Sequence, residues 1–474
     1  MLFSSLPFLF GFLPLFFLVY FAVKGRTVRN IILLVFSLIF YAWGEPVYVF
    51  LMIFSIMCDY VCGYYVSKYI DDKKTAKRFV IASVVINLCV LGFFKYADFF
   101  IANLSLIPAF SGLEPIGLSL PIGISFYTFQ TMSYTIDIYR GDAKVQKNIT
   151  SFGAYVAAFP QLVAGPIIRY HTIAEELNAR TESYENFAAG LRRFSAGLAK
   201  KVLIANNTAA LCDGILRLPG ADYGAAGAWL AMVAYSLQIY FDFSGYSDMA
   251  IGLGRMMGFH YLENFNYPYI AKSVSDFWRR WHISLSTFFR DYVYIPLGGN
   301  RVKTSRWILN MMLVWLLTGF WHGAAWNFIL WGLYFGIILI IERMFLQKTL
   351  EKFDKLKIPV FNHLYTIIVF IFGWVIFRAE SLSHIGEIVS AMFGANGAGS
   401  FIRLTELDIV QLPHLIAIVA GIICSAPISK FMKENLEVTF AGRLIIDIST
   451  FAALIFCIFS LAVGSYNPFI YFIF

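Results

Sequence analysis

Charged side chains are scarce in this sequence. Lys, Arg, Asp and Glu make up 14% of its 474 residues, whereas 59% are hydrophobic. The mean hydropathy is +0.69. Since a soluble domain carries roughly 25% charged residues, the composition excludes a soluble protein with a single anchor. It predicts an all-α polytopic membrane protein, because helices satisfy their own backbone hydrogen bonds in lipid.

Motifs for metal ions and for reactive nucleophiles are also missing. The six cysteines form no C-x-x-C pair, and the sequence contains no H-E-x-x-H. Ser247 lacks the closing glycine of a G-x-S-x-G elbow. The basic residues behind the net charge of +8 are scattered between apolar segments. We therefore expect no bound metal or cofactor, no disulfides and no nucleic-acid partner, and we assign the positive charge to cytoplasmic loops.

Apolar runs that approach the length of a membrane span recur along the chain. The candidate spans are 6–23, 30–44, 46–66, 79–101, 117–138, 202–216, 226–243, 307–321, 324–341, 359–377, 409–425 and 444–462. Segments 150–166 and 246–262 are shorter or interrupted by polar residues and could be re-entrant, so the number of spans stays open. We interpret 6–23 as a span and not as a signal peptide, because it is long and no basic residues precede it.

Basic loops predict the orientation of these spans. Lysines and arginines follow the first, third and fifth spans, and if these loops are cytoplasmic the N-terminus lies outside. The loops concerned contain Lys24, Arg26, Lys73, Lys74 and Arg140. We expect one integral membrane domain, 1–474, with N-terminal helices over 1–145, a catalytic core over 146–345 and C-terminal helices over 346–474.

One ionisable residue, His322, lies at the centre of the apolar stretch 315–331. Burying such a side chain in a membrane protein is costly, which favours a functional role. Gly319 and Gly323 would let another backbone approach closely, and the chain is predicted to turn there between two apolar helices. A neutral imidazole is available as a base near neutral pH. The alternative is a structural histidine hydrogen-bonded to a carbonyl group.

The segment 276–292 has the periodicity of a single amphipathic helix with an aromatic face and a basic face. The basic face consists of Arg279, His282, Ser286 and Arg290. Ser273 or Ser275 could cap its start. The arginines are suited to the phosphates of an acyl carrier, with His282 facing a cavity. The alternative is a helix that lies on lipid headgroups.

Two carboxylates, Asp242 and Asp248, occur in a glycine- and serine-containing segment that we expect to interrupt a helix. They could orient a histidine or pair with an arginine. A purely structural ion pair is the alternative.

Several sequence blocks resemble the membrane-bound O-acyltransferase family. They are Trp-His-Gly-Ala-Ala-Trp-Asn at 321–327 and Phe-Trp-Arg-Arg-Trp-His-Ile-Ser-Leu-Ser at 277–286. The blocks at 121–130, 159–166 and 291–301 are similar to the bacterial branch of that family, and most of all to the membrane subunits of alginate O-acetyltransferases. The resemblance covers most of the chain.

This resemblance implies a helical core with re-entrant and in-plane helices around a transmembrane tunnel. The signature histidine of the family falls on His322, as general base or acyl relay, and its second polar position falls on His282, which would assist or position a thioester. The remaining candidates for binding the donor or substrate are Arg279, Arg280, Ser286, Arg290, Trp321, Asn327 and Asp242.

The implied activity is transfer of an acyl group, with acetyl-CoA as the expected donor, across a bacterial plasma membrane for O-acetylation of an extracytoplasmic polysaccharide. An extracytoplasmic SGNH-type, esterase-like protein is the implied partner. One alternative is D-alanyl transfer to teichoic acid from a carrier protein. A transporter or flippase that uses broken helices is the other, although the inverted repeats typical of that class are not visible.

Overall fold

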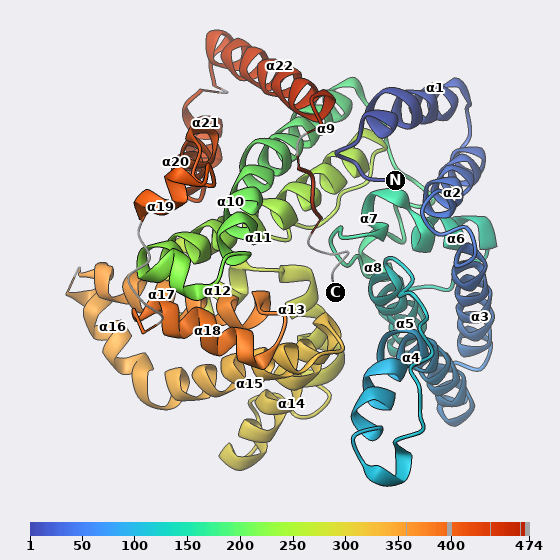
Figure 1. The fold of residues 1–474 in the computed structure, drawn as a ribbon. Coiled ribbons are helices and arrows are strands. Elements are labelled where there is room, and N and C mark those ends of the chain that lie inside the picture. Colours follow the sequence, from blue (N-terminus) through green and yellow to red (C-terminus); the bar gives the residue numbers. More distant parts are fainter. Residues whose placement is uncertain (357, 396–400, 437, 465, 470–474) are drawn as a thin grey trace. The chain divides into compact units, whose positions relative to one another are not determined.

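Helices dominate the computed structural model, which describes residues 1–356, 358–395, 401–436, 438–464 and 466–469 (Figure 1). No strand occurs in these described ranges. They form two units, Met1–Phe194 with Tyr246–Leu262 and Ser195–Gly245 with Glu263–Phe474. Two of the three boundaries fall inside α9 (Tyr184–Ala199) and α11 (Gly220–Met256), and the third follows Leu262. The stretch 146–345, which we predicted to be one core, therefore contributes to both units.

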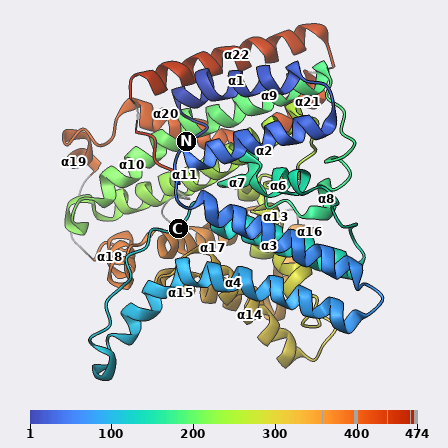
Figure 2. The same cartoon turned by 90° about the vertical axis from the view of Figure 1, so that its right-hand side faces the viewer.

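The first unit contains long N-terminal helices followed by short ones. These are π-helix η1 (Pro7–Phe12), α1 (Leu13–Ala22), α2 (Arg26–Ala42), α3 (Val49–Lys68), α4 (Lys73–Leu104), 3-10 helix η2 (Pro108–Phe110), α5 (Ile124–Arg140), α6 (Ile149–Ala157), α7 (Phe159–Leu162) and α8 (Tyr170–Ile173). Figure 2 shows α3 and α4 side by side. The segment 150–166 divides between α6 and α7 because Pro160 has no N–H group to continue a helix.

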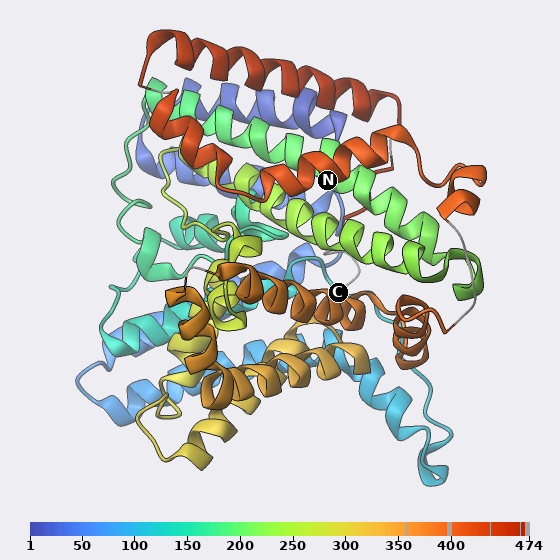
Figure 3. The ribbon, with the colours of Figure 1, turned by 90° about the vertical axis from the view of Figure 1, so that its left-hand side faces the viewer.

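The second unit begins with the end of α9, followed by η3 (Lys200–Ala205) and α10 (Asn206–Leu216), and includes most of α11. Further along lie η4 (Pro268–Ile270), α12 (Val274–Arg280), α13 (Ile283–Phe289), η5 (Arg290–Tyr294), α14 (Thr304–His322), α15 (Trp326–Ile341), η6 (Glu342–Leu346), α16 (Gln347–Lys355) and α17 (Pro359–Arg378). The last helices are α18 (Leu382–Met392), α19 (Phe401–Glu406), α20 (Leu412–Cys424), α21 (Ile428–Asn435) and α22 (Phe440–Ala462). Within this unit α17 packs beside α15 (Figure 3).

The predicted all-α membrane architecture is confirmed. Five helical stretches of the described chain are long and apolar enough to cross a membrane: Val49–Lys68, Lys73–Leu104, Trp326–Lys355, Val360–Arg378 and Phe440–Ala462. Pro7–Ala22 and Leu412–Cys424 are shorter apolar helices. The other expected spans are helical over part or all of their length, but their helices are not both long and apolar enough to be counted with these five. The run 117–138, for example, becomes helical at Ile124.

A charge cluster around Glu182 connects α1 and α2 to the segment that precedes α9. Its carboxylate accepts hydrogen bonds from Arg26 and from the Tyr20 hydroxyl, the latter at 3.0 Å, and pairs with Arg29 at 2.9 Å. Arg180 donates to the Tyr20 hydroxyl at 2.9 Å. Burial by itself would raise the pKa of Glu182, but the hydrogen bonds and charges of Arg26, Tyr20 and Arg29 lower it to about 2.

Replacing Glu182→Gln should lower the thermal unfolding midpoint of the detergent-solubilised protein, since the arginines lose their counter-charge at a cost of about 3 kcal/mol. Because the folded pKa lies below the ordinary value of 4.5, the carboxylate's contribution is fully present above pH 4.5 and disappears as the pH falls towards 2. Unfolding curves across this range would measure the change. The exposed Glu185→Gln is the matched control. Equal midpoints for both variants would contradict the role of the cluster.

Candidate active site

Close packing of α14 against α15 places His322. A side-chain Cβ at Gly319 would lie 2.3 Å from the Phe328 carbonyl oxygen, and one at Gly332 would lie 2.4 Å from the Trp315 carbonyl oxygen. Glycine is therefore required on both helices for their backbones to touch. Helix α14 ends at His322, and α15 begins at Trp326. The predicted turn between two apolar helices at this histidine is confirmed.

Aromatic rings enclose the imidazole of His322, which is 7% exposed. The ring centroids of Trp321 and Trp331 each lie 5.0 Å from that of His322, and the centroid of Phe377 lies 5.2 Å away. All three rings meet the imidazole nearly edge to face, with interplanar angles of 76–82°. Helices α14, α15 and α17 thus fix the ring on three sides.

The single helix expected over 276–292 is instead two short helices, α12 and α13, separated at Trp281 and His282. His282 has a left-handed backbone with a φ of 45°. Residues from an earlier part of the chain satisfy the interrupted backbone: the Asn266 N–H donates to the Arg280 carbonyl at 2.9 Å, and the Ile283 N–H donates to the Asn264 carbonyl at 3.0 Å. These hydrogen bonds replace the ones that a continuous helix would make, so the Arg280 carbonyl and the Ile283 N–H stay paired at the break.

Two side chains cap the start of α12. Ser273, one of the two serines proposed for this role, accepts from the Asp276 N–H at 3.0 Å. The carboxylate of Glu342 accepts from the Val274 N–H at 2.7 Å and from the Ser275 N–H at 2.9 Å. Glu342 is 3% exposed and was not predicted as a functional residue. A carboxylate directly after the apolar run of α15 was the available signal.

A cavity of about 370 Å³ in the second unit brings the two histidines together. Of the predicted site residues, those lining it are His282, His322, Arg279, Ser286 and Arg290. Arg343 and Asn300 also line this cavity and were not among the predicted site residues. Asn300 lies in the block 291–301 that carries part of the family resemblance, whereas Arg343 follows α15 in a segment without such a block. The cavity therefore combines two imidazoles with three guanidinium groups. Such a site can hold an anionic ligand beside a base.

The remaining predicted residues are not among those lining the cavity. Arg280 pairs with Asp276 at 3.0 Å. Asn327 donates to the Ala379 carbonyl at 2.9 Å. The Trp321 ring touches both imidazoles, with centroids 5.9 Å from His282 and 5.0 Å from His322. Trp321 thus supports both histidines, whereas Asn327 ties α15 to the chain after α17.

Asp242 forms an ion pair with Lys201, with their charged atoms 2.7 Å apart. The side chains are 2% and 3% exposed, respectively. The helix break expected at Asp242 and Asp248 is wrong, because α11 continues through both positions. Asp248 pairs with Arg193 at 2.6 Å in the first unit. Both carboxylates thus take part in ion pairs. An ion pair was the alternative to a role in orienting a histidine.

Burial controls the protonation of His282, which is 1% exposed. Loss of water around the ring lowers its pKa well below the usual value, and a positive charge on His322 would lower it further. The imidazole is therefore neutral near pH 7. The Phe243 ring covers one side of it at a centroid distance of 4.6 Å. Its Nε2 atom has no hydrogen-bond partner within the described part of the chain.

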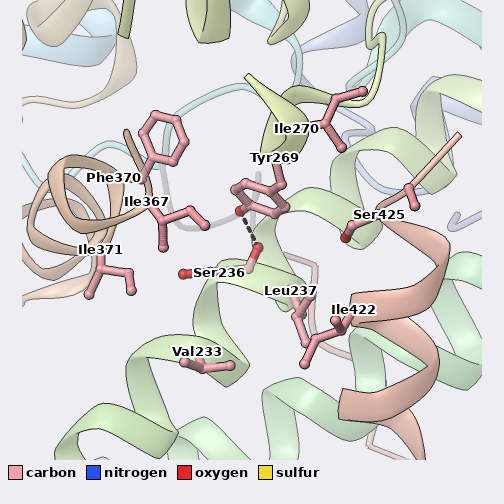
Figure 4. A pocket seen from close by; sticks show the side chains of 11 residues that line it. Val233, Ser236, Leu237, Tyr269, Ile270, Ile367, Phe370, Ile371, Ile422 and Ser425 are labelled. Atoms are coloured by element: carbon pink, nitrogen blue, oxygen red, sulfur yellow. Dashed lines mark hydrogen bonds between the residues drawn. The ribbon is translucent and has the colours of Figure 1, made fainter. Parts of the chain in front are cut away.

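A second cavity, of about 260 Å³, lies between α11, α17 and the end of α20 (Figure 4). Its three hydroxyl groups are occupied by backbone carbonyls. Ser236 donates to Met232 at 2.7 Å, Tyr269 to Ser236 at 2.5 Å, and Ser425 to Gly421 at 2.8 Å. The rest of the lining is apolar. Since this cavity offers no base and no charged group among its described lining residues, the cavity with the two histidines is the candidate active site.

Comparisons with known proteins point to acyl transfer. The family model described as "MBOAT, membrane-bound O-acyltransferase family" matches residues 120–382. The probable alginate O-acetylase AlgI of Pseudomonas aeruginosa is 46% identical, over 88% of this chain and 78% of that protein. The peptidoglycan O-acetyltransferase of Helicobacter pylori is 38% identical, over 84% and 80%. The teichoic acid D-alanyltransferase of Bacillus subtilis is 33% identical, over 56% and 70%.

Replacing Glu342→Ala should loosen α12, because the buried Val274 N–H loses its acceptor at about 1–3 kcal/mol and the half-buried Ser275 N–H loses its acceptor as well. We expect a lower unfolding midpoint and faster amide hydrogen exchange in 274–280. Both can be measured on the detergent-solubilised protein. The exposed Glu351→Ala on α16 is the control. Unchanged exchange in 274–280 would show that Glu342 does not hold the start of α12.

Proposed function

The chain belongs to the membrane-bound O-acyltransferase family, and from this premise we propose that it transfers an acetyl group from acetyl-CoA to a hydroxyl of an extracytoplasmic polysaccharide. Its class as an O-acyltransferase follows from the family. The acetyl group and the glycan acceptor are supported by relatives named for alginate and peptidoglycan O-acetylation. D-alanyl transfer is less supported, because the relative named for it matches a smaller part of the chain.

The observation that carries this proposal is the cavity that holds both His282 and His322 with arginines on its wall. Acetyl-CoA contains a thioester, which the histidines would meet, and phosphates, which guanidinium groups bind well. Arg343 is held in place, since its guanidinium carbon lies 4.6 Å from the centre of the Trp307 ring.

In the proposed reaction, His322 takes the proton of the acceptor hydroxyl while the hydroxyl oxygen attacks the thioester carbonyl. A carbon–oxygen bond forms, the carbon–sulfur bond breaks, and the imidazolium returns its proton to the leaving thiolate. Alternatively, an imidazole nitrogen of His322 attacks the thioester carbonyl, the carbon–sulfur bond breaks, and the imidazole N–H proton passes to the leaving thiolate. The acceptor hydroxyl then attacks the acyl-imidazole, the carbon–nitrogen bond breaks, and the hydroxyl proton returns to His322. In both routes His282 positions the thioester.

The topology that we propose follows from the basic loops. The chain lies in a bacterial plasma membrane with its N-terminus outside. Donor binding is then cytosolic and acceptor binding extracytoplasmic. An SGNH-type, esterase-like protein outside the membrane would receive the acetyl group or deliver the polysaccharide. Cysteine labelling of the 102–116 loop with a membrane-impermeant reagent tests this orientation, because the loop should react in intact cells.

Replacing His322→Ala should reduce acetyl transfer by about 10²- to 10⁴-fold, the usual contribution of a general base. Binding of radiolabelled acetyl-CoA should stay unchanged, because the variant keeps the arginines. The control is His363→Ala, whose ring bonds to the Ala271 carbonyl at 3.1 Å outside the cavity. Retained transfer in His322→Ala would rule out its catalytic role. Labelling only in the presence of an aminoacylated carrier protein would instead favour D-alanyl transfer.

Replacing Arg343→Ala should raise the KM for acetyl-CoA roughly tenfold or more, since a charged hydrogen bond contributes about 1.5–3 kcal/mol. The kcat should change little, because Arg343 binds the donor away from the reacting carbonyl. Initial rates at varied acetyl-CoA concentration measure both constants. The exposed Arg306→Ala is the matched control. If only kcat fell, Arg343 would not be a donor-binding residue.

A further inference from the structure

Asn264 is a buried residue, 1% exposed, whose side-chain oxygen faces three groups of the α12–α13 break. The Ser284 backbone N–H donates to this oxygen at 3.1 Å, and the Ser284 hydroxyl donates to it at 2.9 Å. His282 Nδ1 lies 3.3 Å from the same atom. The Ser284 hydroxyl oxygen also lies 3.5 Å from Nδ1, but its hydrogen is directed to the shorter contact with Asn264. The carboxamide oxygen thus connects the histidine to the start of α13.

The Ser284 N–H fixes which way the Asn264 carboxamide points. A backbone N–H can only donate, so the atom that it meets must be the carboxamide oxygen and not the nitrogen. His282 Nδ1 therefore faces an acceptor. If Nδ1 carried no hydrogen, two lone pairs would face each other. With the hydrogen on Nδ1, the contact becomes a hydrogen bond, and Nε2 is left with the lone pair.

We propose that Asn264 is a positioning residue that holds His282 in the tautomer with its hydrogen on Nδ1, so that Nε2 presents a lone pair to the cavity. Asn264 also positions the main chain, because its carbonyl accepts from the Ile283 N–H at 3.0 Å. This bond secures the break beside the left-handed backbone of His282, a conformation that non-glycine residues keep only when the surrounding structure enforces it.

The fixed tautomer limits the role of His282 in acetyl transfer. This role rests on the proposed function. A neutral Nε2 accepts hydrogen bonds and cannot donate one to a developing oxyanion. It suits the amide N–H groups of the pantetheine arm of a thioester donor, or the hydroxyl of the acceptor. Trp278 also lines the cavity, and its buried indole N–H has no partner in the described ranges.

The tautomer can be measured directly by ¹⁵N NMR of protein labelled in its 7 histidines, with His282→Gln used to assign the signal. We expect the wild type to carry hydrogen on Nδ1. In Asn264→Leu this tautomer should lose its dominance, whereas Asn264→Asp should keep it, because a carboxylate oxygen is also an acceptor. Asn362→Leu removes a buried asparagine that bonds to the Leu350 carbonyl and should leave the signal unchanged.

Activity provides a second measurement. Asn264→Leu should lower kcat for acetyl transfer by about tenfold, which is roughly the worth of one lost positioning hydrogen bond. Asn264→Asp should restore most of it at high pH. Its negative charge raises the pKa of His282, so the acid limb of its pH profile should move to higher pH. The other charged or titratable side chains lining the cavity are His322, Arg279, Arg290, Arg343 and Tyr294, and the substitution removes none of them.

The proposal is overturned if wild-type His282 carries its hydrogen on Nε2, or if Asn264→Leu leaves the tautomer unchanged. If Asn264→Leu does not fold, Asn264→Asp still tests the proposal. An acid limb identical to that of the wild type would contradict the contact between residue 264 and His282. The NMR result needs no substrate. An Nδ1–H signal that depends on Asn264 therefore supports the proposal even if the protein transfers no acetyl group. Absence of transfer would contradict the proposed function and not the role of Asn264.

Discussion

The contact between the backbones of α14 and α15 is the constraint on which the candidate active site depends. Gly319 and Gly332 let the two helices touch, which places the end of α14 beside the rings of α15. His322 occupies that end, and Trp331 comes from the facing helix. Any side chain at either glycine would separate the helices and move His322 away from its aromatic surroundings. The polar chemistry is thus positioned by apolar packing.

Polar groups in the second unit are placed by partners that offset the cost of burying them. The carboxylate of Glu342 accepts hydrogen bonds from the first N–H groups of α12, and Asp242 pairs with Lys201. Arg343 differs from these two acidic residues because it is exposed to solvent, and its guanidinium packs on Trp307. A buried charge with a partner is tolerated, whereas an isolated one is not. The groups left for chemistry are the histidines and arginines that line the cavity.

The sequence predicted the helical membrane fold and the turn at His322, because both depend on local features: long apolar runs, and glycines beside a histidine. The break at His282 could not be predicted in this way. The residues 276–292 have a continuous helical pattern, and the hydrogen bonds that interrupt it come from Asn264 and Asn266. Glu342 was missed for the same reason, since its partners on α12 lie 68 and 67 residues away in the chain.

The different surroundings of the two histidines suit them to different roles. Burial and any charge on His322 oppose protonation of His282, and Asn264 fixes its ring. Such a group accepts a hydrogen bond well and a proton poorly. In the proposed reaction the proton of the acceptor hydroxyl therefore passes to His322, whose ring is held by aromatic edges. Two imidazoles in one cavity then do not compete for one proton, because one of them is kept neutral.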